Sequence, residues 1–232
     1  MKIFPAIDLF EGKVVRLVRG KLSEMKIYGN PLEIAERFSK YFKRLHIVDL
    51  EGAFEGKPRN LEIVRKITEK FSFEIEIGGG FRKEEDIKRA FDCGVKYVIL
   101  GTAATNFRFL EKISEKYNGI TASLDSKNGK IKTSGWINEN MTLTEFFDEA
   151  RKYVKRFVYT DVTRDGTLLG VEKIRKFWDR EEIVYAGGVV TKEDINILNR
   201  TGFSGVIVGK ALYERKLTEK ELAEVEECLQ KE

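Results

Sequence analysis

The stretches GGFRKEEDIKRAFDCGVKYVILGTA (residues 79–103) and GGVVTKEDINILNRTGFSGVIVGKA (residues 187–211) align without a gap and are identical at ten of their 25 positions. A shorter repeat lies before each of them, because Asp8-x-x-x-Gly-Lys matches Asp125-x-x-x-Gly-Lys. Self-similarity at a fixed period is typical of architectures made from repeated units. The sequence therefore predicts a duplication, with two halves at about residues 1–118 and 119–232.

Short apolar or β-branched runs alternate with longer amphipathic segments, which is the pattern of repeated βα units around a parallel sheet. Eight runs are predicted strands: 3–7, 44–48, 73–77, 97–100, 120–124, 156–159, 183–186 and 206–208. Helices are expected between them, including two that end before Gly94 and Gly202. Eight units in two equal halves favour a closed (β/α)8 TIM barrel over an open doubly wound sheet. No linker-like segment divides the 232 residues, so we expect one domain over residues 1–232.

Composition argues against several classes of function. The 42 basic and 38 acidic residues nearly balance, and no basic stripe predicts a nucleic-acid partner. The two cysteines lack C-x-x-C spacing and His46 is the one histidine, which makes a metal site, a disulfide framework or a Cys/His nucleophile pair improbable. No signal peptide opens the chain, and no apolar run reaches the roughly 18 residues of a membrane span. We expect a cytoplasmic protein with no membrane contact.

Glycines follow several predicted strands, at the ends where barrels of this class carry their active sites. Backbone N–H groups at such glycines can approach an anion closely, and the next helix adds its positive dipole end. Two phosphate sites are predicted, one at Gly187, Gly188, Gly209 and Lys210, and its repeat at Gly79, Gly80, Gly101 and Thr102. Glycine pairs also mark ordinary turns. The two matched sets favour binding, and they predict a small molecule with a phosphate at each end as the partner.

Asp8 and Asp125 follow the first and fifth predicted strands, which face each other across an eight-stranded barrel. Two opposed carboxyl groups can act as base and acid if their surroundings separate their pKa values. Such proton transfers at adjacent carbons need neither metal nor cofactor. The structural alternative is that both residues only cap turns, and Asp49, Asp161 and Asp165 fit that alternative better.

The ordered motifs PAIDLFEGKVVRLVRG, HIVDLEGA, IGGGFR, LGTAA, SLD…GK…GW, TDVTRDGT, AGGV and IVGKA resemble an enzyme family of histidine biosynthesis. This family is the phosphoribosylformimino-aminoimidazole carboxamide ribotide (ProFAR) isomerase family, and the resemblance runs from Ile3 to about Tyr213. It implies a (β/α)8 barrel and an aldose–ketose isomerase that performs an Amadori rearrangement of a substrate with two phosphates. It also implies a cofactor-free enzyme, and we expect a monomer.

The resemblance also implies roles for individual residues. Asp8 would be the proton acceptor at C2′ and Asp125 the proton donor for ring opening, with Thr160 and Asp165 supporting Asp125. Other implied substrate contacts are Arg16, His46, Arg82 and Trp136, the last stacking on the imidazole carboxamide. His46 could equally be an interior imidazole with satisfied hydrogen bonds. Trp136 could equally be a packing residue.

Three alternatives to this function are open at this stage. The cyclase subunit of imidazole glycerol phosphate synthase shares the two aspartates, but it generally has a lysine where this chain has Arg16. A bifunctional isomerase that also accepts phosphoribosylanthranilate usually has an arginine where Ser134 stands. A non-catalytic barrel could bind a phosphorylated metabolite.

The segments Arg19–Asn30 and Ser126–Asn140 are expected to be loops that close over a ligand.

Overall fold

The computed structural model describes residues 1–18, 21–127, 130–131, 141–172 and 174–231. Within these residues, eight parallel strands form a closed ring, because the last strand pairs with the first. In ring order they are β1 (Lys2–Phe10), β4 (Arg44–Asp49), β5 (Glu74–Gly78), β6 (Tyr97–Leu100), β7 (Ile120–Lys127), β9 (Arg156–Asp161), β10 (Glu182–Ala186) and β11 (Gly205–Val208). The predicted (β/α)8 barrel is confirmed.

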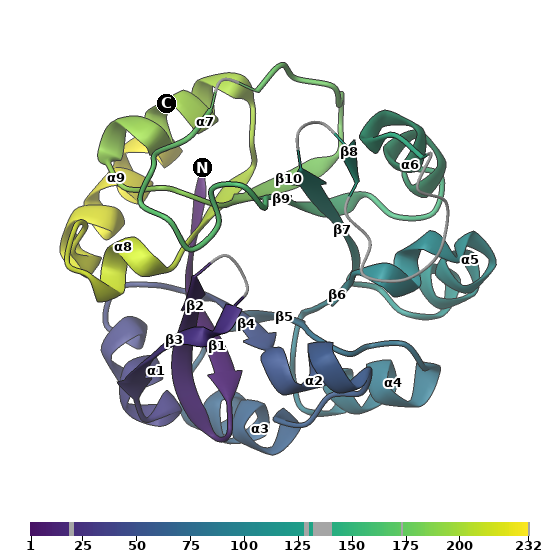
Figure 1. Ribbon diagram of the computed structural model, residues 1–232, viewed down its shortest axis with the longest axis horizontal. Coiled ribbons are helices and arrows are strands. Elements are labelled where there is room, and N and C mark those ends of the chain that lie inside the picture. Colours follow the sequence, from purple (N-terminus) through teal and green to yellow (C-terminus); the bar gives the residue numbers. More distant parts are fainter. Residues whose placement is uncertain (19–20, 128–129, 132–140, 173, 232) are drawn as a thin grey trace.

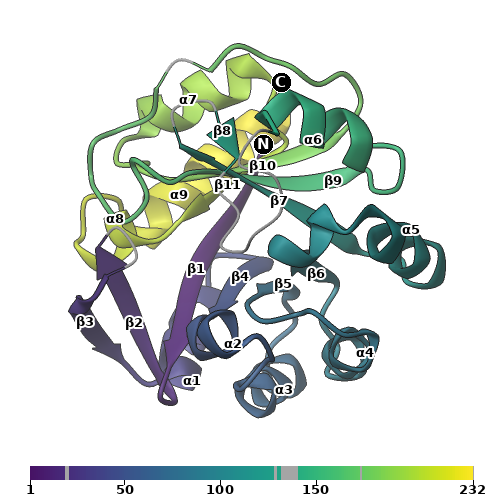
Figure 2. The same ribbon diagram turned by 45° about the vertical axis from the view of Figure 1, so that its right-hand side comes forward.

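Helices surround this ring on its outside (Figure 1), and the turned view shows the same arrangement (Figure 2). They are α1 (Pro31–Ser39), α2 (Leu50–Glu55), α3 (Leu61–Lys70), α4 (Glu84–Asp92), the 3-10 helix η1 (Thr102–Thr105), α5 (Phe107–Lys116), α6 (Leu143–Ala150), α7 (Lys192–Thr201), α8 (Lys210–Tyr213) and α9 (Glu219–Lys231). The predicted end of α7 is correct, because Gly202 caps it with a φ of +99°. No helix among the described residues is long and apolar enough to cross a membrane.

The register of the barrel repeats between its two halves. Asp8 of β1 lies opposite Val48 of β4, and Asp125 of β7 lies opposite Thr160 of β9. The neighbouring pairs also correspond, since Val48 lies opposite Gly78 and Thr160 lies opposite Ala186. A duplicated half-barrel predicts this repetition, because equivalent strands then start their pairing at equivalent residues. It places Asp8 and Asp125 at equivalent points on opposite strands of the ring.

The connection from β9 to β10 departs from the expected alternation of strands and helices. No helix is assigned within residues 162–172 and 174–181, the described part of this connection. Its outer layer contains aromatic side chains instead: the Phe177 ring centroid lies 5.2 Å from that of Phe147 and 5.0 Å from that of Trp178. Trp178 in turn lies 4.6 Å from Phe203, after α7. These rings bury the apolar surface that a helix covers elsewhere.

The segment after β1 continues into two further strands. Residues 13–18 form β2 (Lys13–Val18), which pairs with β1, and β3 (Lys21–Gly29) pairs antiparallel with β2. Part of Arg19–Asn30, expected to be a loop that closes over a ligand, is therefore the regular strand β3. The tight turn between β1 and β2 uses Glu11 and Gly12, both at positive φ. The short β8 (Lys130–Ile131) pairs with β7 in the other half.

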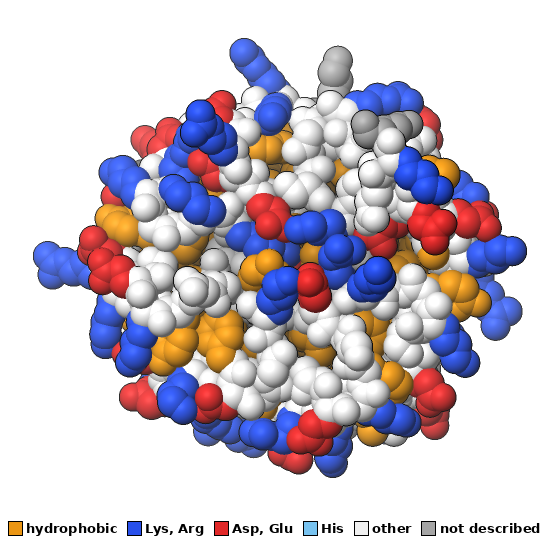
Figure 3. Space-filling view, turned by 180° about the vertical axis from the view of Figure 1, so that it is seen from behind, with side chains coloured by type: hydrophobic (Ala, Val, Ile, Leu, Met, Phe, Trp, Pro, Cys, Tyr) orange, Lys and Arg blue, Asp and Glu red, His pale blue; other side chains and the backbone are white. Residues whose placement is uncertain are grey.

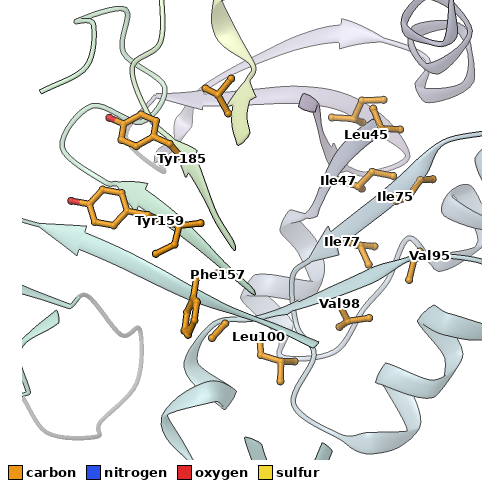
Figure 4. Close-up of a cluster of buried hydrophobic side chains, with 14 of the residues drawn as sticks. Leu45, Ile47, Ile75, Ile77, Val95, Val98, Leu100, Phe157, Tyr159 and Tyr185 are labelled. Atoms are coloured by element: carbon orange, nitrogen blue, oxygen red, sulfur yellow. The ribbon is translucent and has the colours of Figure 1, made fainter. Parts of the chain in front are cut away.

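The barrel has an outer and an inner apolar layer. The outer layer lies between strands and helices, and Figure 4 shows part of it, with Leu45, Ile77 and Phe157 among the buried side chains. Alternate residues of the strands face the barrel axis instead. Their apolar cluster is small and consists of Phe4, Ala6, Ile99, Val158, Val184, Ala186 and Ile207.

Several barrel strands begin with a charged residue. Lys2 of β1 pairs with Glu182 of β10 at 2.9 Å, and Glu74 of β5 pairs with Lys96 at 2.6 Å. Lys, Arg, Asp and Glu side chains also lie together over the middle of the face opposite to that of Figure 1 (Figure 3). Oppositely charged neighbours at the strand starts keep this face of the barrel polar.

Substituting Trp178 tests whether the aromatic rings replace a helix. Trp178 is 3% exposed, so Trp178→Ala should lower the free energy of unfolding by about 3–5 kcal/mol through lost packing. Phe54→Ala is the control, because Phe54 is 54% exposed and its loss should change stability by less than about 0.5 kcal/mol. Urea unfolding measures both. Equal midpoints for the two variants would contradict a packing role for this connection.

Candidate active site

A cavity of about 350 Å³ lies in the described part of the protein and opens at the carboxyl ends of the strands. Barrel enzymes carry their active sites at this end. The cavity brings together most of the site residues expected from the sequence: Asp8, Arg16, His46, Gly79, Gly80, Arg82, Gly101, Thr102, Asp125, Thr160 and Asp165. Residues from both halves of the chain therefore line one space.

A smaller cavity of about 40 Å³ holds the second set of predicted phosphate ligands, Gly187, Gly188, Gly209 and Lys210. Arg16 and Asp165 line both cavities. The two spaces are therefore neighbours. One glycine set lies at the larger cavity and its repeat at the smaller one, so a ligand with two anionic ends could extend from one to the other.

Asp8 is held by Arg16, which comes from the neighbouring strand β2. Arg16 Nη1 donates to Asp8 Oδ2 at 2.7 Å, and Nη2 donates to the Ala6 carbonyl at 3.1 Å. Tyr213 completes this arrangement: its ring lies 5.3 Å from the guanidinium carbon, and its hydroxyl donates to the Ala6 carbonyl at 2.8 Å. These contacts fix the Asp8 carboxyl group at the wall of the larger cavity.

Asp125 lies on β7, across the ring from β1. Its Oδ1 accepts a hydrogen bond from the Ser123 hydroxyl at 2.6 Å. Ser123 stands two residues earlier on the same strand, so both side chains point to the same face. Thr160 pairs with Asp125 in the β7–β9 register and also lines the cavity.

Asp165 is the third carboxyl group of the cavity, and its environment differs from that of the other two. It faces the open space, yet crowding by surrounding protein raises its pKa, and the negative charges of Asp8 and Asp125 raise it further. The positive charge of Arg16 opposes the increase without cancelling it. Asp165 therefore holds a proton at higher pH than an ordinary aspartate does.

The remaining side chains predicted to contact the substrate differ in burial and in hydrogen bonding. His46 is buried, and its Nδ1 lies 2.5 Å from Glu76 Oε1. Arg82 is exposed at the rim of the cavity, where its guanidinium lies against Gly56. Lys210 donates from Nζ to the Gly166 carbonyl at 2.9 Å. Trp136 lies outside the described residues.

Asp49 and Asp161 organise loops and do not line either cavity. The Asp49 carboxylate accepts hydrogen bonds from the backbone N–H groups of Gly52, Arg59 and Asn60 and from the Asn60 amide. Asp161, its counterpart in the register, accepts from the backbone and hydroxyl of Thr163. The interpretation of these two aspartates as turn residues fits these contacts.

The glycines of the two predicted phosphate sites fall into two kinds. Gly79 and Gly187 have φ values of +115° and +116°, and a Cβ on either would lie 2.1 Å and 2.7 Å from a carbonyl oxygen, of Asp49 and Asp161 respectively. Packing of the loops alone requires glycine at these positions. At Gly101, by contrast, a Cβ would meet nothing within 4 Å. Gly101 therefore leaves open space at the wall of the larger cavity.

Sequence reasoning missed two residues of this site, Ser123 and Tyr213. Ser123 could have been found from the two-residue period of the strand that carries Asp125. Tyr213 could not, because its contact with Arg16 joins residues 197 positions apart in the chain only after the ring closes.

Alanine substitutions should separate the two kinds of glycine. Gly79→Ala is expected to lower the free energy of unfolding by about 2 kcal/mol or more, because of its positive φ and the clash with Asp49. Gly101→Ala should cost much less stability, while its methyl group projects into the cavity and weakens ligand binding. Chemical unfolding and calorimetric titration with a phosphorylated ligand measure the two effects. Equal losses of stability would contradict the distinction.

Comparisons with known proteins agree with the geometry. The sequence model of the histidine biosynthesis protein family matches residues 2–218. A protein of Pyrococcus furiosus is 56% identical over 97% of this chain and 94% of its own length. Relatives from Thermococcus onnurineus and Thermococcus kodakarensis are 51% and 50% identical over 98% and 100% of this chain and 100% of their own. All three are named 1-(5-phosphoribosyl)-5-((5-phosphoribosylamino)methylideneamino) imidazole-4-carboxamide isomerase. The chain therefore belongs to the histidine biosynthesis protein family, as the resemblance of its motifs predicted.

Proposed function

We propose that the protein is the isomerase for which these relatives are named, converting the aminoaldose ProFAR to its aminoketose by acid–base catalysis. One observation carries the proposal: Asp8 and Asp125, on opposite strands, line one cavity together with one of the two glycine sets, and the other glycine set lines the neighbouring cavity. A substrate held by both ends would have its reacting carbons between the two carboxyl groups. Fixing the geometry in this way removes much of the entropic barrier to reaction.

The reaction moves protons within one molecule and needs no external oxidant or reductant. An acid protonates the ring oxygen O4′ as its bond to C1′ breaks, which leaves a Schiff base between C1′ and nitrogen. A base then removes the proton from C2′, and the electron pair of that bond forms the enolamine. Protonation at C1′ and loss of the hydroxyl proton on C2′ give the ketone. C1′ is reduced, C2′ is oxidised, and the atoms balance.

The charges around the three carboxyl groups support a division of these roles. Asp8, paired with Arg16 at 2.7 Å, is the base that accepts the C2′ proton. Asp125 is the donor toward O4′, with Thr160 beside it in the register. Asp165, whose pKa is raised by burial and by the charges of Asp8 and Asp125, keeps its proton to higher pH than an ordinary aspartate does. We assign proton supply to Asp125 and Asp165 as a coupled pair.

The two phosphates are assigned to the two glycine sets. At the larger cavity, Gly101 leads into η1, and at the smaller one Gly209 leads into α8. Backbone N–H groups at these points can donate to phosphate oxygens. Arg82 at the rim, and Lys210 beside Gly209, add positive charge at either end. We expect the enzyme to work as a monomer in the cytoplasm on this small bis-phosphorylated molecule.

Turnover by the purified protein tests the function itself. Given ProFAR alone, the protein should produce the ribulosyl isomer, followed by absorbance or chromatography. Given the ribulosyl isomer with ammonia, it should form no imidazole glycerol phosphate, which separates an isomerase from a cyclase. A folded protein that binds ProFAR without converting it would instead be a non-catalytic binder.

Asp8→Asn and Asp125→Asn should each lower kcat by about 100-fold or more, because general acid–base groups contribute roughly that much. The dissociation constant for substrate should change far less, since the phosphates supply most of the binding. Stopped-flow binding and steady-state rates measure the two quantities. Asp49→Asn is a poor control because it breaks a loop, whereas Glu111→Gln, on the exposed face of α5, should leave kcat unchanged.

The pH dependence of kcat tests the role of Asp165. The pKa of Asp165 is raised, and Asp165 loses its proton as the pH rises through this pKa. Because the proposal makes this proton part of the acid catalysis, kcat should fall over the same pH range. Asp165→Asn should lower kcat and remove this alkaline decline, because asparagine does not titrate. A variant that keeps both the rate and the decline of the unmodified enzyme would show that Asp165 supplies no proton.

A further inference from the structure

A buried charged network lies inside the barrel below the larger cavity. Glu76 of β5 is fully buried, and one carboxylate oxygen lies 2.5 Å from His46 Nδ1. Its other oxygen accepts a hydrogen bond from Arg156 of β9, across the interior. Arg156 also donates to the Thr121 hydroxyl at 3.2 Å and lies over the Tyr97 ring at 4.2 Å. The network connects His46, at the cavity wall, with the strand starts.

Glu76 is a carboxylate in this network. Burial by itself would raise its pKa, but the positive charge of Arg156 and the hydrogen bond from His46 outweigh burial and lower it. An ionised carboxylate can only accept hydrogen bonds, so Nδ1 of His46 must carry the proton between them. In the neutral ring Nε2 then has a free lone pair, and it is the ring nitrogen left for the cavity that His46 lines.

The second half of the barrel shows that its fold does not need this pair. His46 corresponds in the register to Val158 of β9, and Glu76 corresponds to Val184 of β10. The valines are 3% and 0% exposed, so the same two interior positions are filled there by apolar side chains. A buried ion pair is often no more stabilising than apolar residues of similar volume. The fold therefore does not require Glu76 and His46, and a role of His46 at the cavity accounts for the pair.

We propose that Glu76 is a positioning residue for His46: it holds the Nδ1–H and presents Nε2 to the substrate as a fixed hydrogen-bond acceptor. This inference rests on the proposed isomerase function and names a contact that the function requires. His46 lies on β4, between the strand of Asp8 and the strand that leads to Gly79 and Gly80. The group that it recognises is a hydrogen-bond donor, a hydroxyl or amide N–H, on the part of the substrate between the base and the first phosphate.

The single histidine allows the ring to be observed directly. The full chain labelled with 15N-histidine gives signals from His46 alone. In the neutral ring, Nδ1 should carry the proton and Nε2 should not. Glu76→Gln should yield a mixture of the two tautomers, because an amide can either donate or accept. An unmodified enzyme with its proton on Nε2 would overturn the proposal, whatever its activity.

Activity adds a second measurement. Glu76→Gln should lower kcat/KM by about 10–100-fold, the range for groups that orient a functional histidine. Glu182→Gln is the matched control, because Glu182 contacts Arg156 and Lys2 in the same network but not His46. It should change kcat/KM by less than about threefold. An equal loss in both variants would show that only the charge balance of the barrel interior matters, and would overturn the proposal.

Two valine variants cover the case in which Glu76→Gln fails to fold. His46→Val and the double variant His46→Val/Glu76→Val adopt the valines of the second half, and the double variant should fold. If Glu76 acts only through His46, both variants should have the same reduced kcat/KM. A further loss of more than about threefold in the folded double variant would contradict the proposal. Absence of turnover in the unmodified enzyme would instead contradict the isomerase function, while the tautomer measurement would still test the pairing.

Discussion

Closure of the parallel sheet is the constraint on which the site depends. Ile3 of β1 pairs with Val206 of β11, and this contact joins segments about two hundred residues apart in the chain. Without it β1 and β7 would be strands of an open sheet, and Asp8 would not face Asp125. Tyr213 reaches the Ala6 carbonyl and Arg16 only because the ring is closed. Fold stability and the opposition of the two carboxyl groups therefore have the same origin.

The barrel interior combines two kinds of packing along its axis. Apolar side chains such as Phe4 and Val184 fill its middle, while charged groups occupy part of the space below the mouth. Buried charges are costly unless they are paired, and here Arg156 and His46 both bind Glu76. The valines at the corresponding positions of the other half fill the same space without the free-energy cost of burying a charge. The two otherwise matched halves therefore differ at these two interior positions.

Glycine serves two purposes at the mouth. At Gly79 and Gly187 a positive φ and a nearby carbonyl leave no room for a side chain, so the loops themselves require glycine. At Gly101 there is room, and the absence of a side chain exposes the backbone to the cavity. Turn geometry and anion binding are therefore compatible explanations of one motif. Turn geometry explains the conformation of the loop, and anion binding would depend on the backbone N–H groups of that loop.

The sequence alone determined the barrel, the equivalence of its halves and the identity of the opposed aspartates, because repeats and strand periodicity are local properties of the chain. It also indicated the helix that ends at Gly202 and the turn role of Asp49. Tertiary structure decided what depends on contacts between distant segments. It set the raised pKa of Asp165 beside Asp8, the aromatic rings that replace a helix before β10, and the link from Glu76 to Arg156. Burial and the approach of charges arise only when strands far apart in the chain come together, so no periodic pattern reveals them.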